Sequence, residues 1–494
     1  MAMANAQEVF HSGNVLSFYG RMQTDVAEIV AYMPQSKTLF VVGEGKNLEV
    51  IDFSDPAHLK KIAAQPLRGE GTSVSVHGEL VAVASLAEQN HDTGYVEIFK
   101  YSASEKDQLT RVYDFAPCHQ PDMLTFTPDG QKVVVACEGS PSSDFKIDPP
   151  GGIAIISLNA KPAPKVNVLG FETQDSLSLM VSGVRRVGLA PFHNTLEPEY
   201  VTVSGDSKIA WVSLQENNAI AKVNLEKEKI ESIFALGSVD HSKPGFGLDA
   251  VKDKKIDIRN WPLHGLRQPD GIANFKVGSQ YVVLTANEGS PVNDYDRWTD
   301  ETTVLELYRK GMLDTNVFDE KTIAELKELT VSNSDGCNAS QCSQLHTFGG
   351  RSISLFDGAS GKLLWDSGDQ LEQTIAKVAS KYFNWNAKKG KAKVDARSSD
   401  KGSEPENVTV GKVGGKTYAF VGMERMSGVA VFDLTQYKPG GKEAPKIVDF
   451  YFDPSDRGPE GMLFISAEKS PVKGVSLLVV GYEYSKTIVV YRVH

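Results

Sequence analysis

Hydrophobic and polar residues alternate over many short segments of the chain, and several of these segments form the same kind of hairpin. At 268–289 (QPDGIANFKVGSQYVVLTANEG), Asp270 opens a short alternating strand, a turn follows, and the second strand runs into Glu288. Alternation with a period of two residues indicates half-buried β-strands. The sequence therefore predicts a repeated hairpin with an acidic residue at each end. The same order recurs in three other segments, 120–139, 197–217 and 404–425.

Seven hairpins of this kind occur along the chain, and the two acidic residues of a hairpin are 16 to 23 positions apart. A third and usually a fourth strand, rich in Val and Ile, follow each hairpin. Seven units of four short strands predict an all-β fold, a seven-bladed β-propeller. The acidic pairs are Glu28 with Glu44, Glu70 with Glu88, Asp122 with Glu138, Glu199 with Glu216, Asp270 with Glu288, Glu406 with Glu424, and Glu460 with Glu483.

The two ends of the chain and four insertions complete this prediction. The last unit has only three predicted strands, so we expect an N-terminal strand at 15–21 to supply the fourth and close the ring. Apolar residues at helical spacing in TVLELYRKGML and TIAELKEL predict a helical stretch at 300–329, and a helix is also predicted at 371–383. We expect a single domain over residues 1–494 with a helical cap on one face. The insertions, on the rims, are 172–196, 237–265, 289–349 and 371–403.

Charge and composition exclude several classes of function. The net charge of −11 argues against binding to nucleic acid or to an anionic membrane, and it favours binding of cations. No apolar run approaches 18 residues, so we expect no insertion into a membrane. The segment Ala-Asn-Ala-Gln at 4–7 resembles the small-residue end of a cleaved signal peptide, which leaves open a mature, secreted form.

Four cysteines allow two local disulfides. Cys118 and Cys137 fall in one hairpin region, and Cys337 and Cys342 flank a short loop. The alternative is four free thiols. Zinc is not expected, because neither a CxxC motif nor clustered histidines accompany these residues.

The acidic residues of the hairpins are the first candidates for chemistry. The innermost strands of a propeller line its central channel, so seven repeats bring many carboxylates to one channel mouth. Like charges at close range must be paired, hydrogen-bonded, protonated or bound to a metal. Each carboxylate has a purely structural alternative, capping backbone N–H groups. Clustered oxygens with few His or Cys suit Ca²⁺, and Mg²⁺ less well. The predicted metal ligands are Glu138, Asp270, Glu288, Glu406, Asp294, Asp296, Glu199 and Glu424.

A mixed basic and acidic segment at 394–408 is the second candidate. The guanidinium of Arg397 suits a phosphate, Lys401 adds a positive charge, and Asp400 lies between them. A metal ion, an anion clamp and an activated water would together support phosphoryl chemistry. The catalytic candidates are therefore Arg397, Lys401 and Asp400. The alternative is an exposed, salt-bridged loop.

Other motifs are weak or missing. The loop after Glu288 places Asp294 and Asp296 at alternating positions, but it does not fit the EF-hand pattern. His119, His193 and His264 each precede an inner strand, where hydrogen bonding is a more common role than catalysis. The GxSxG elbow, the Walker A loop, HExxH and a dinucleotide-binding GxGxxG are absent. Serine-hydrolase, kinase-like and Rossmann chemistry are therefore disfavoured.

The segments QPDMLTFTPDGQKVVVACEGSPSSDF, LEPEYVTVSGDSKIAWVSLQENNAIAKVNL, QPDGIANFKVGSQYVVLTANEGSPVNDYD, FGGRSISLFD and DARSSDKGSEPENVTVGKVGGKTYAFVGMER together resemble the choice-of-anchor I family. That family comprises secreted or surface propeller proteins, among them atypical microbial alkaline phosphatases and mesenchyme-specific cell-surface glycoproteins. The resemblance implies a secreted, extracellular or periplasmic location, dependence on calcium and no nucleophilic serine.

Residues and resemblance together lead to one expected function and one alternative. We expect a secreted, calcium-dependent phosphomonoesterase that acts on a small phosphate ester or another anionic substrate. Its cofactor would be Ca²⁺, with a second divalent ion or an iron ion as a further option. The alternative is a non-catalytic, calcium-binding adhesion protein of a cell surface or a biomineral matrix, which uses the same carboxylates.

Overall fold

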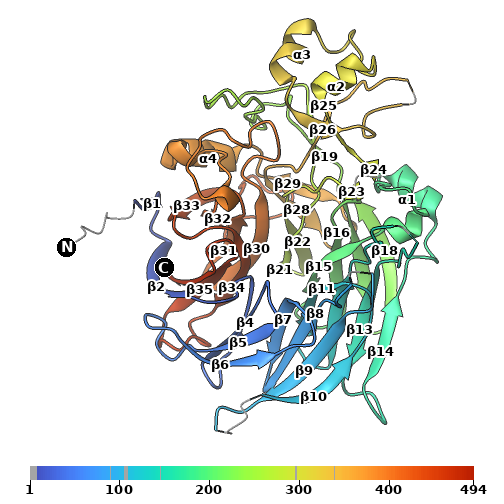
Figure 1. Ribbon diagram of the computed structural model, residues 1–494. Coiled ribbons are helices and arrows are strands. Elements are labelled where there is room, and N and C mark those ends of the chain that lie inside the picture. Colours follow the sequence, from blue (N-terminus) through green and yellow to red (C-terminus); the bar gives the residue numbers. More distant parts are fainter. Residues whose placement is uncertain (1–7, 90, 105–108, 145, 295–297, 339) are drawn as a thin grey trace.

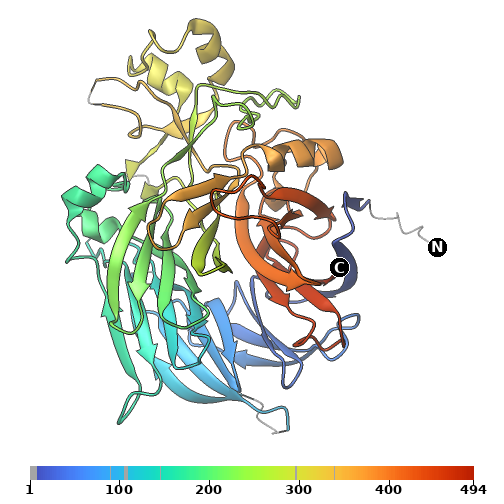
Figure 2. The ribbon, with the colours of Figure 1, turned by 180° about the vertical axis from the view of Figure 1, so that it is seen from behind.

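The computed structural model describes residues 8–89, 91–104, 109–144, 146–294, 298–338 and 340–494. The fold is all-β and propeller-like, with small antiparallel sheets side by side and few helices (Figures 1 and 2). Within the described residues, seven sheets have four or more strands. In five of them the strands lie in the order of the chain, as repeated hairpins require, and in the other two an N-terminal strand is added after the last strand in that order.

The strands of these seven sheets are as follows. The first three sheets are β3 (Ile29–Met33), β4 (Thr38–Val42), β5 (Asn47–Asp52) and β6 (Lys60–Pro66); β7 (Gly71–His77), β8 (Leu80–Ser85), β9 (Tyr95–Tyr101) and β10 (Leu109–Phe115); and β11 (Pro121–Phe126), β12 (Lys132–Cys137), β13 (Gly152–Ser157) and β14 (Lys165–Leu169). The fourth and fifth are β15 (Pro198–Val203), β16 (Ile209–Leu214), β17 (Ala219–Asn224) and β18 (Lys229–Ala235); and β21 (Ile272–Val277), β22 (Gln280–Ala286), β28 (Ile353–Asp357) and β29 (Leu363–Asp366). The last two are β30 (Pro405–Val413), β31 (Lys416–Met423), β32 (Val429–Asp433) and β33 (Lys446–Phe452), extended by β1 (Phe10–His11); and β34 (Pro459–Ile465), β35 (Ser476–Tyr482), β36 (Thr487–Val493) and β2 (Leu16–Gln23).

The first strands of successive sheets contact one another. β3 contacts β7, β7 contacts β11, and the series continues through β15, β21, β30 and β34, which in turn contacts β3. The backbone N–H of Gly461 donates to the carbonyl oxygen of Glu28 at 3.0 Å, which joins the last sheet to the first. The N-terminal strand β2 pairs antiparallel with β36, from Leu16 opposite Val493 to Gln23 opposite Thr487. The expected N-terminal strand at 15–21 therefore forms and pairs with the last strand of the chain.

Apolar side chains fill the spaces between neighbouring sheets. Val134, Ile153 and Ile155 of the third sheet, for example, share a buried cluster with Val212 and Ala221 of the fourth. Because both faces of such sheets are covered, their central strands contain nearly continuous runs of Val, Ile and Ala rather than strict alternation. The burial of these runs fixes the strand register and thus the position of the residues at the strand ends.

The segments outside these sheets form short elements. Residues 172–196 contain α1 (Ser176–Ser182) and the 3₁₀ turn η1 (Phe192–Thr195). β19 (Ser238–Asp240), β20 (His264–Leu266) and β27 (His346–Phe348) form a three-stranded sheet, and β23 (Asn293–Asp294) pairs with β24 (Trp298–Thr299). β25 (Glu301–Thr303) pairs with β26 (Thr330–Ser332) beside α2 (Val304–Arg309) and α3 (Glu320–Leu326), which project together from the sheets (Figure 1). The remaining elements are α4 (Gln370–Val378), η2 (Ser380–Tyr382) and η3 (Ala387–Lys389).

The helical stretch predicted at 300–329 forms two short helices, α2 and α3, which overlap its two segments of helical spacing. The first helix stops before Gly311, which adopts a left-handed φ of 67°. Asp319 then starts α3 by accepting the backbone N–H of Thr322 at 2.8 Å. The helix predicted at 371–383 is present as α4 and ends near Val378. Among the described residues, no helix is long and apolar enough to cross a membrane.

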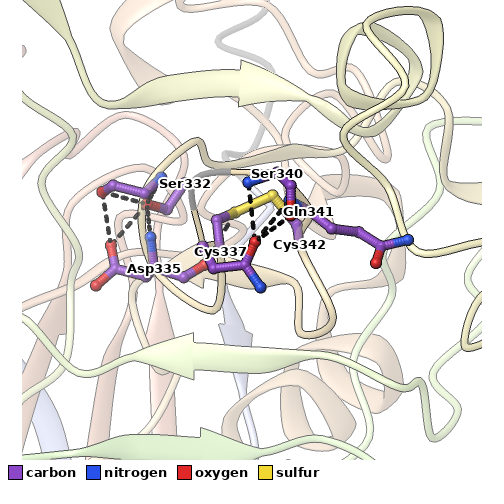
Figure 3. Close-up of a disulfide and its surroundings, with 8 residues drawn as sticks. Ser332, Asp335, Cys337, Ser340, Gln341 and Cys342 are labelled. Carbon is purple, nitrogen blue, oxygen red and sulfur yellow. Dashed lines mark hydrogen bonds between the residues drawn. A yellow bond between two sulfur atoms is a disulfide. The ribbon is translucent and has the colours of Figure 1, made fainter.

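All four cysteines form disulfides. Cys118 is bonded to Cys137 at the end of β12, and Cys337 is bonded to Cys342 in the loop between β26 and β27. Figure 3 shows the second disulfide beside Asp335, whose carboxylate accepts a hydrogen bond from Ser332 Oγ at 2.6 Å. The alternative of four free thiols is therefore wrong.

Candidate metal centre

The opening acid of each hairpin lies where the first strand of a sheet begins. In four sheets the strand starts with Pro and the acid follows directly: Asp122, Glu199, Glu406 and Glu460. The pairing register of these four strands shifts just after the proline, which indicates a β-bulge at the acid. A β-bulge re-aims the side chain that it contains. The local sequence Pro-acid thus accounts for the position of the carboxylates at one end of the inner strands.

Six carboxylates at this end of the inner strands surround a cavity of about 230 Å³. Its lining also includes Tyr200, Gln215 and Asn407, and among the described residues it includes no Lys, Arg or His. The negative charges that face the cavity therefore have no cationic side chain among their neighbours in the lining. The six carboxylates are those of Glu28, Asp122, Glu138, Glu199, Asp270 and Glu460.

Burial and mutual repulsion raise the pKa of every one of these groups. Burial, followed by the charges of neighbouring carboxylates, raises the pKa of Glu28 to about 7, although the N–H of Glu44 bonds to it. Burial and Glu216 likewise raise the pKa of Glu138 to about 7, and burial raises the pKa of Asp270 to about 6. The pKa values of the other three lie well above the usual range for the same reasons. A cation would remove this repulsion and favour the ionised forms.

Asp270, Glu288 and Glu406 lie close together. One carboxylate oxygen from each lies within 4.8 Å of the others, a spacing that one metal ion can bridge. Glu406 is only 6% exposed, and its Oε2 has no hydrogen-bond partner within the described part of the chain. Burial and then Glu288 raise the pKa of Glu406 well above its ordinary value. We call these three residues the tri-carboxylate group.

A second set of close carboxylates, Glu288, Glu404 and Glu424, is already neutralised by cationic side chains. The ammonium of Lys401 donates to Glu288 and to the carbonyl oxygen of Gly289, the latter at 2.6 Å, and its Nζ lies 2.9 Å from Glu404 Oε2. Burial alone would lower the pKa of Lys401, but Glu288 and Glu404 outweigh it and raise that pKa. Glu288 belongs to both sets and binds this ammonium, whereas Asp270 and Glu406 form no ion pair with a Lys or Arg of the described residues.

The two residues predicted to hold phosphate are both engaged with carboxylates. Arg397 donates through Nε to Glu404, and its Nη2 lies 2.9 Å from Asp400 Oδ2. Arg425 also contacts Glu404, through Nε at 3.4 Å. Burial would raise the pKa of Glu404, but Lys401, Arg397 and Arg425 together lower it. The segment at 394–408 is thus a partly buried ion-pair network.

Comparisons with known proteins now identify the family. Residues 28–437 match the model of the choice-of-anchor I domain. The chain belongs to the choice-of-anchor I family. It is 32% identical over 280 residues to the mesenchyme-specific cell surface glycoprotein of Strongylocentrotus purpuratus, a match that covers 49% of this chain and 35% of that protein. It is 31% identical over 115 residues to gigasin-3a of Magallana gigas, which covers 22% of this chain and 40% of that protein.

The choice-of-anchor I chain thus spans well under half the length of the curated relatives that it matches. Among solved structures, hydrazine synthase of Kuenenia stuttgartiensis aligns with a TM-score of 0.49 and 12% identity, over 95% of this chain and 97% of that chain.

The choice-of-anchor I structure brings together most of the predicted ligands. Glu138, Glu199 and Asp270 line the cavity, and Glu288 and Glu406 complete the tri-carboxylate group. Glu424 instead pairs with Arg425 at 3.2 Å and accepts a hydrogen bond from the hydroxyl of Tyr484. The backbone of Asp294 lies in β23, and Asp296 lies outside the described residues.

Three cavity-lining acids were not among the predicted ligands, although the repeat itself marks them. Glu28, Asp122 and Glu460 open three other hairpins of the repeat, at the position that Asp270 and Glu406 occupy in theirs. Conversely, Glu70 opens the second hairpin but is exposed. The repeat therefore gives the set of candidates, and the packing of neighbouring sheets decides which of them face the cavity.

Proposed function

We propose that this chain is a non-catalytic, divalent-cation-binding domain of a cell-surface or extracellular protein, with Ca²⁺ as its ion. The tri-carboxylate group carries this proposal. Its three oxygens lie within 4.8 Å of one another, and Glu406 offers a buried oxygen that has no donor among the described residues. A buried, unpaired carboxylate is costly unless a cation or a proton binds to it.

The chemistry of the donors selects the class of ion. Asp270, Glu288 and Glu406 supply carboxylate oxygens only, and Gln215 lies next to them with its Nε2 donating to Glu288 at 2.7 Å. Hard cations such as Ca²⁺ prefer oxygen ligands, whereas Zn²⁺ and Cu²⁺ sites contain His or Cys. Ca²⁺ also tolerates the irregular geometry of ligands from separate sheets, which Mg²⁺ does not.

We further infer that the seven sheets are the blades of one β-propeller spanning the chain, with β2 as the strand that closes it. The contacts of β34 with β3 and the pairing of β2 with β36 support this inference. In such a ring, the opening acids of different blades converge on one end of the central channel. The tri-carboxylate group then draws on two adjacent blades, the fifth (Asp270 and Glu288) and the sixth (Glu406).

Two observations support a location outside the cell. Both cysteine pairs form disulfides, which persist in oxidising compartments. One relative carries the name of a cell surface glycoprotein. This name supports a role at a cell surface, where the cation would stabilise the domain.

The phosphomonoesterase prediction has no supporting observation. Its anion clamp requires Arg397 and Lys401 to be free for phosphate, but each binds two carboxylates, and both contact Glu404. A phosphate would have to compete with these buried ion pairs. Cation binding without hydrolysis therefore accounts better for the geometry.

Calorimetric titration of calcium into chelator-treated protein tests the proposal. We expect binding to wild-type protein and a roughly tenfold or larger loss of affinity in Glu406→Gln, by analogy with the loss of other metal-site contacts. The matched control is Glu70→Gln, which alters the opening acid of another hairpin at an exposed position and should bind as wild type does. Absence of calcium binding, or equal affinity in Glu406→Gln and wild type, would contradict the proposal.

A further inference from the structure

The central cavity is larger than a site for one directly coordinated ion requires. Its volume is about 230 Å³, whereas a water molecule occupies about 30 Å³ of the liquid. The tri-carboxylate group shares only Asp270 with its lining. Several waters therefore fit beside the remaining carboxylates.

The charge balance of this space differs from that of its surroundings. Lys401, Arg397 and Arg425 are all bound to Glu288, Glu404 or Glu424. None of the three lines the cavity, so five carboxylates besides Asp270 face it without a cationic partner in the described lining. One of them, Glu138, accepts hydrogen bonds from the side chains of Gln120 and Ser140. The other four are Glu28, Asp122, Glu199 and Glu460.

An independent observation points to a ligand in the same space. Asn407 lines the cavity and is only 4% exposed. Its Nδ2 donates to the hydroxyl of Tyr200 at 3.2 Å. Its Oδ1 is buried and has no hydrogen-bond partner in the described part of the chain. A buried amide oxygen normally has a partner. Water bound to a cation, or the cation itself, would supply one.

We propose that the cavity holds a second class of cations, hydrated divalent ions bound through their water shells by Glu28, Asp122, Glu199 and Glu460, with Asn407 Oδ1 as an acceptor for that water. This inference rests on the proposed function, because it assigns further ions to a cation-binding domain. The two classes differ in chemistry: direct carboxylate coordination at the tri-carboxylate group, and water-mediated binding in the cavity. Asp270 belongs to both and would couple them.

Counting bound calcium by equilibrium dialysis and elemental analysis separates the two classes. We expect more than one ion per chain in wild-type protein, and the loss of the weaker class in the double variant Asp122→Asn/Glu460→Gln. The same variant should keep the tighter class, which Glu406→Gln removes. Removing repelling charges should leave the double variant folded, and circular dichroism checks this. Glu70→Gln is again the control.

Terbium luminescence gives a second readout that depends on position. Tyr200 lines the cavity, so excitation near the tyrosine band should sensitise Tb³⁺ bound there. Tyr200→Phe should remove most of this emission while leaving the tight class of calcium sites intact. Emission that is unchanged in Tyr200→Phe would overturn the cavity site.

The remaining outcomes are also distinct. A count of a single ion that depends on Glu406 would overturn the second class alone. A count of zero would overturn both the second class and the proposed function. A full count in Asp122→Asn/Glu460→Gln would show that the cavity carboxylates bind protons rather than cations.

Discussion

The ammonium of Lys401 donates a hydrogen bond to the carboxylate of Glu288, a residue 113 positions away along the chain. Gln215 donates to the other oxygen of the same carboxylate at 2.7 Å. Glu288 therefore belongs both to a network that contains its own cations and to the tri-carboxylate group. The other two members of that group, Asp270 and Glu406, form no ion pair with a Lys or Arg of the described residues, so they are the carboxylates that remain for a metal.

Replacement of Lys401 should be costly. Lys401→Met leaves Glu288 and Glu404 without their buried partner, and loss of one member of a buried ion pair typically costs about 3–5 kcal/mol of unfolding free energy. Chemical denaturation in the presence of a chelator measures this loss.

The control for Lys401 is Lys208→Met. Lys208 pairs with Glu226 at 3.2 Å, but both side chains are more than half exposed, so this change should have little effect on stability. Equal stabilities of Lys401→Met and wild type would show that the buried network does not stabilise the fold.

The pH dependence of stability should reveal the unpaired carboxylates. The pKa values of Glu28 and Glu138 are raised to about 7 and that of Asp270 to about 6, so in this range the native state binds more protons than the unfolded state. Stability without metal should therefore be highest near pH 4–5 and should fall as the pH rises through 6 to 7. Thermal melts in a chelator at a series of pH values measure this.

Calcium should reverse this trend, because it binds the ionised carboxylates and compensates their repulsion. The melting temperature in excess calcium should therefore rise, or stay constant, from pH 5 to pH 8. If calcium-free protein were instead more stable at pH 8 than at pH 5, the carboxylates would not repel one another as the structure indicates.

The two disulfides should contribute unequally. In the chain-entropy description, a bond that spans 19 residues stabilises by about 3 kcal/mol and one that spans 5 residues by about 2 kcal/mol. Cys118→Ser/Cys137→Ser should thus lower the unfolding free energy more than Cys337→Ser/Cys342→Ser. Urea denaturation of the two double variants compares them. The opposite order would show that the loop between β26 and β27 is the more important one for stability.

A phosphatase assay should give no turnover above background. The ion pairs of Arg397 and Lys401 occupy the groups that would bind phosphate, so p-nitrophenyl phosphate should not be hydrolysed with or without calcium. The variant Arg397→Ala tests whether any observed turnover depends on this predicted phosphate-binding residue. Turnover in wild-type protein that disappears in this variant would restore the phosphomonoesterase hypothesis.

Much of the fold follows directly from the pattern of the sequence. Period-two alternation and the Pro-acid pairs locate the hairpins, because strand ends and bulges depend on local residues. The helical stretch at 300–329 shows the limit of this reasoning for the bounds of elements. Its two segments of helical spacing form α2 and α3, but the left-handed Gly311 and the capping residue Asp319 determine where the first helix ends and the second begins.

The site is less predictable than the fold. Which opening acids face the cavity depends on contacts between sheets. The sequence of a single hairpin therefore does not distinguish Glu28 and Glu460, which line the cavity, from Glu70, which is exposed. The ion pair of Lys401 with Glu404 can be expected from the sequence, because the two residues are three positions apart. The contact of Lys401 with Glu288 joins distant segments, so only the folded structure shows it.

Anomalous diffraction from crystals grown with calcium tests the central claim most directly. We predict an anomalous peak between Asp270, Glu288 and Glu406, at about 2.3–2.6 Å from their carboxylate oxygens. A calcium peak elsewhere in the molecule, with only water between these three residues, would contradict the assignment of the metal centre.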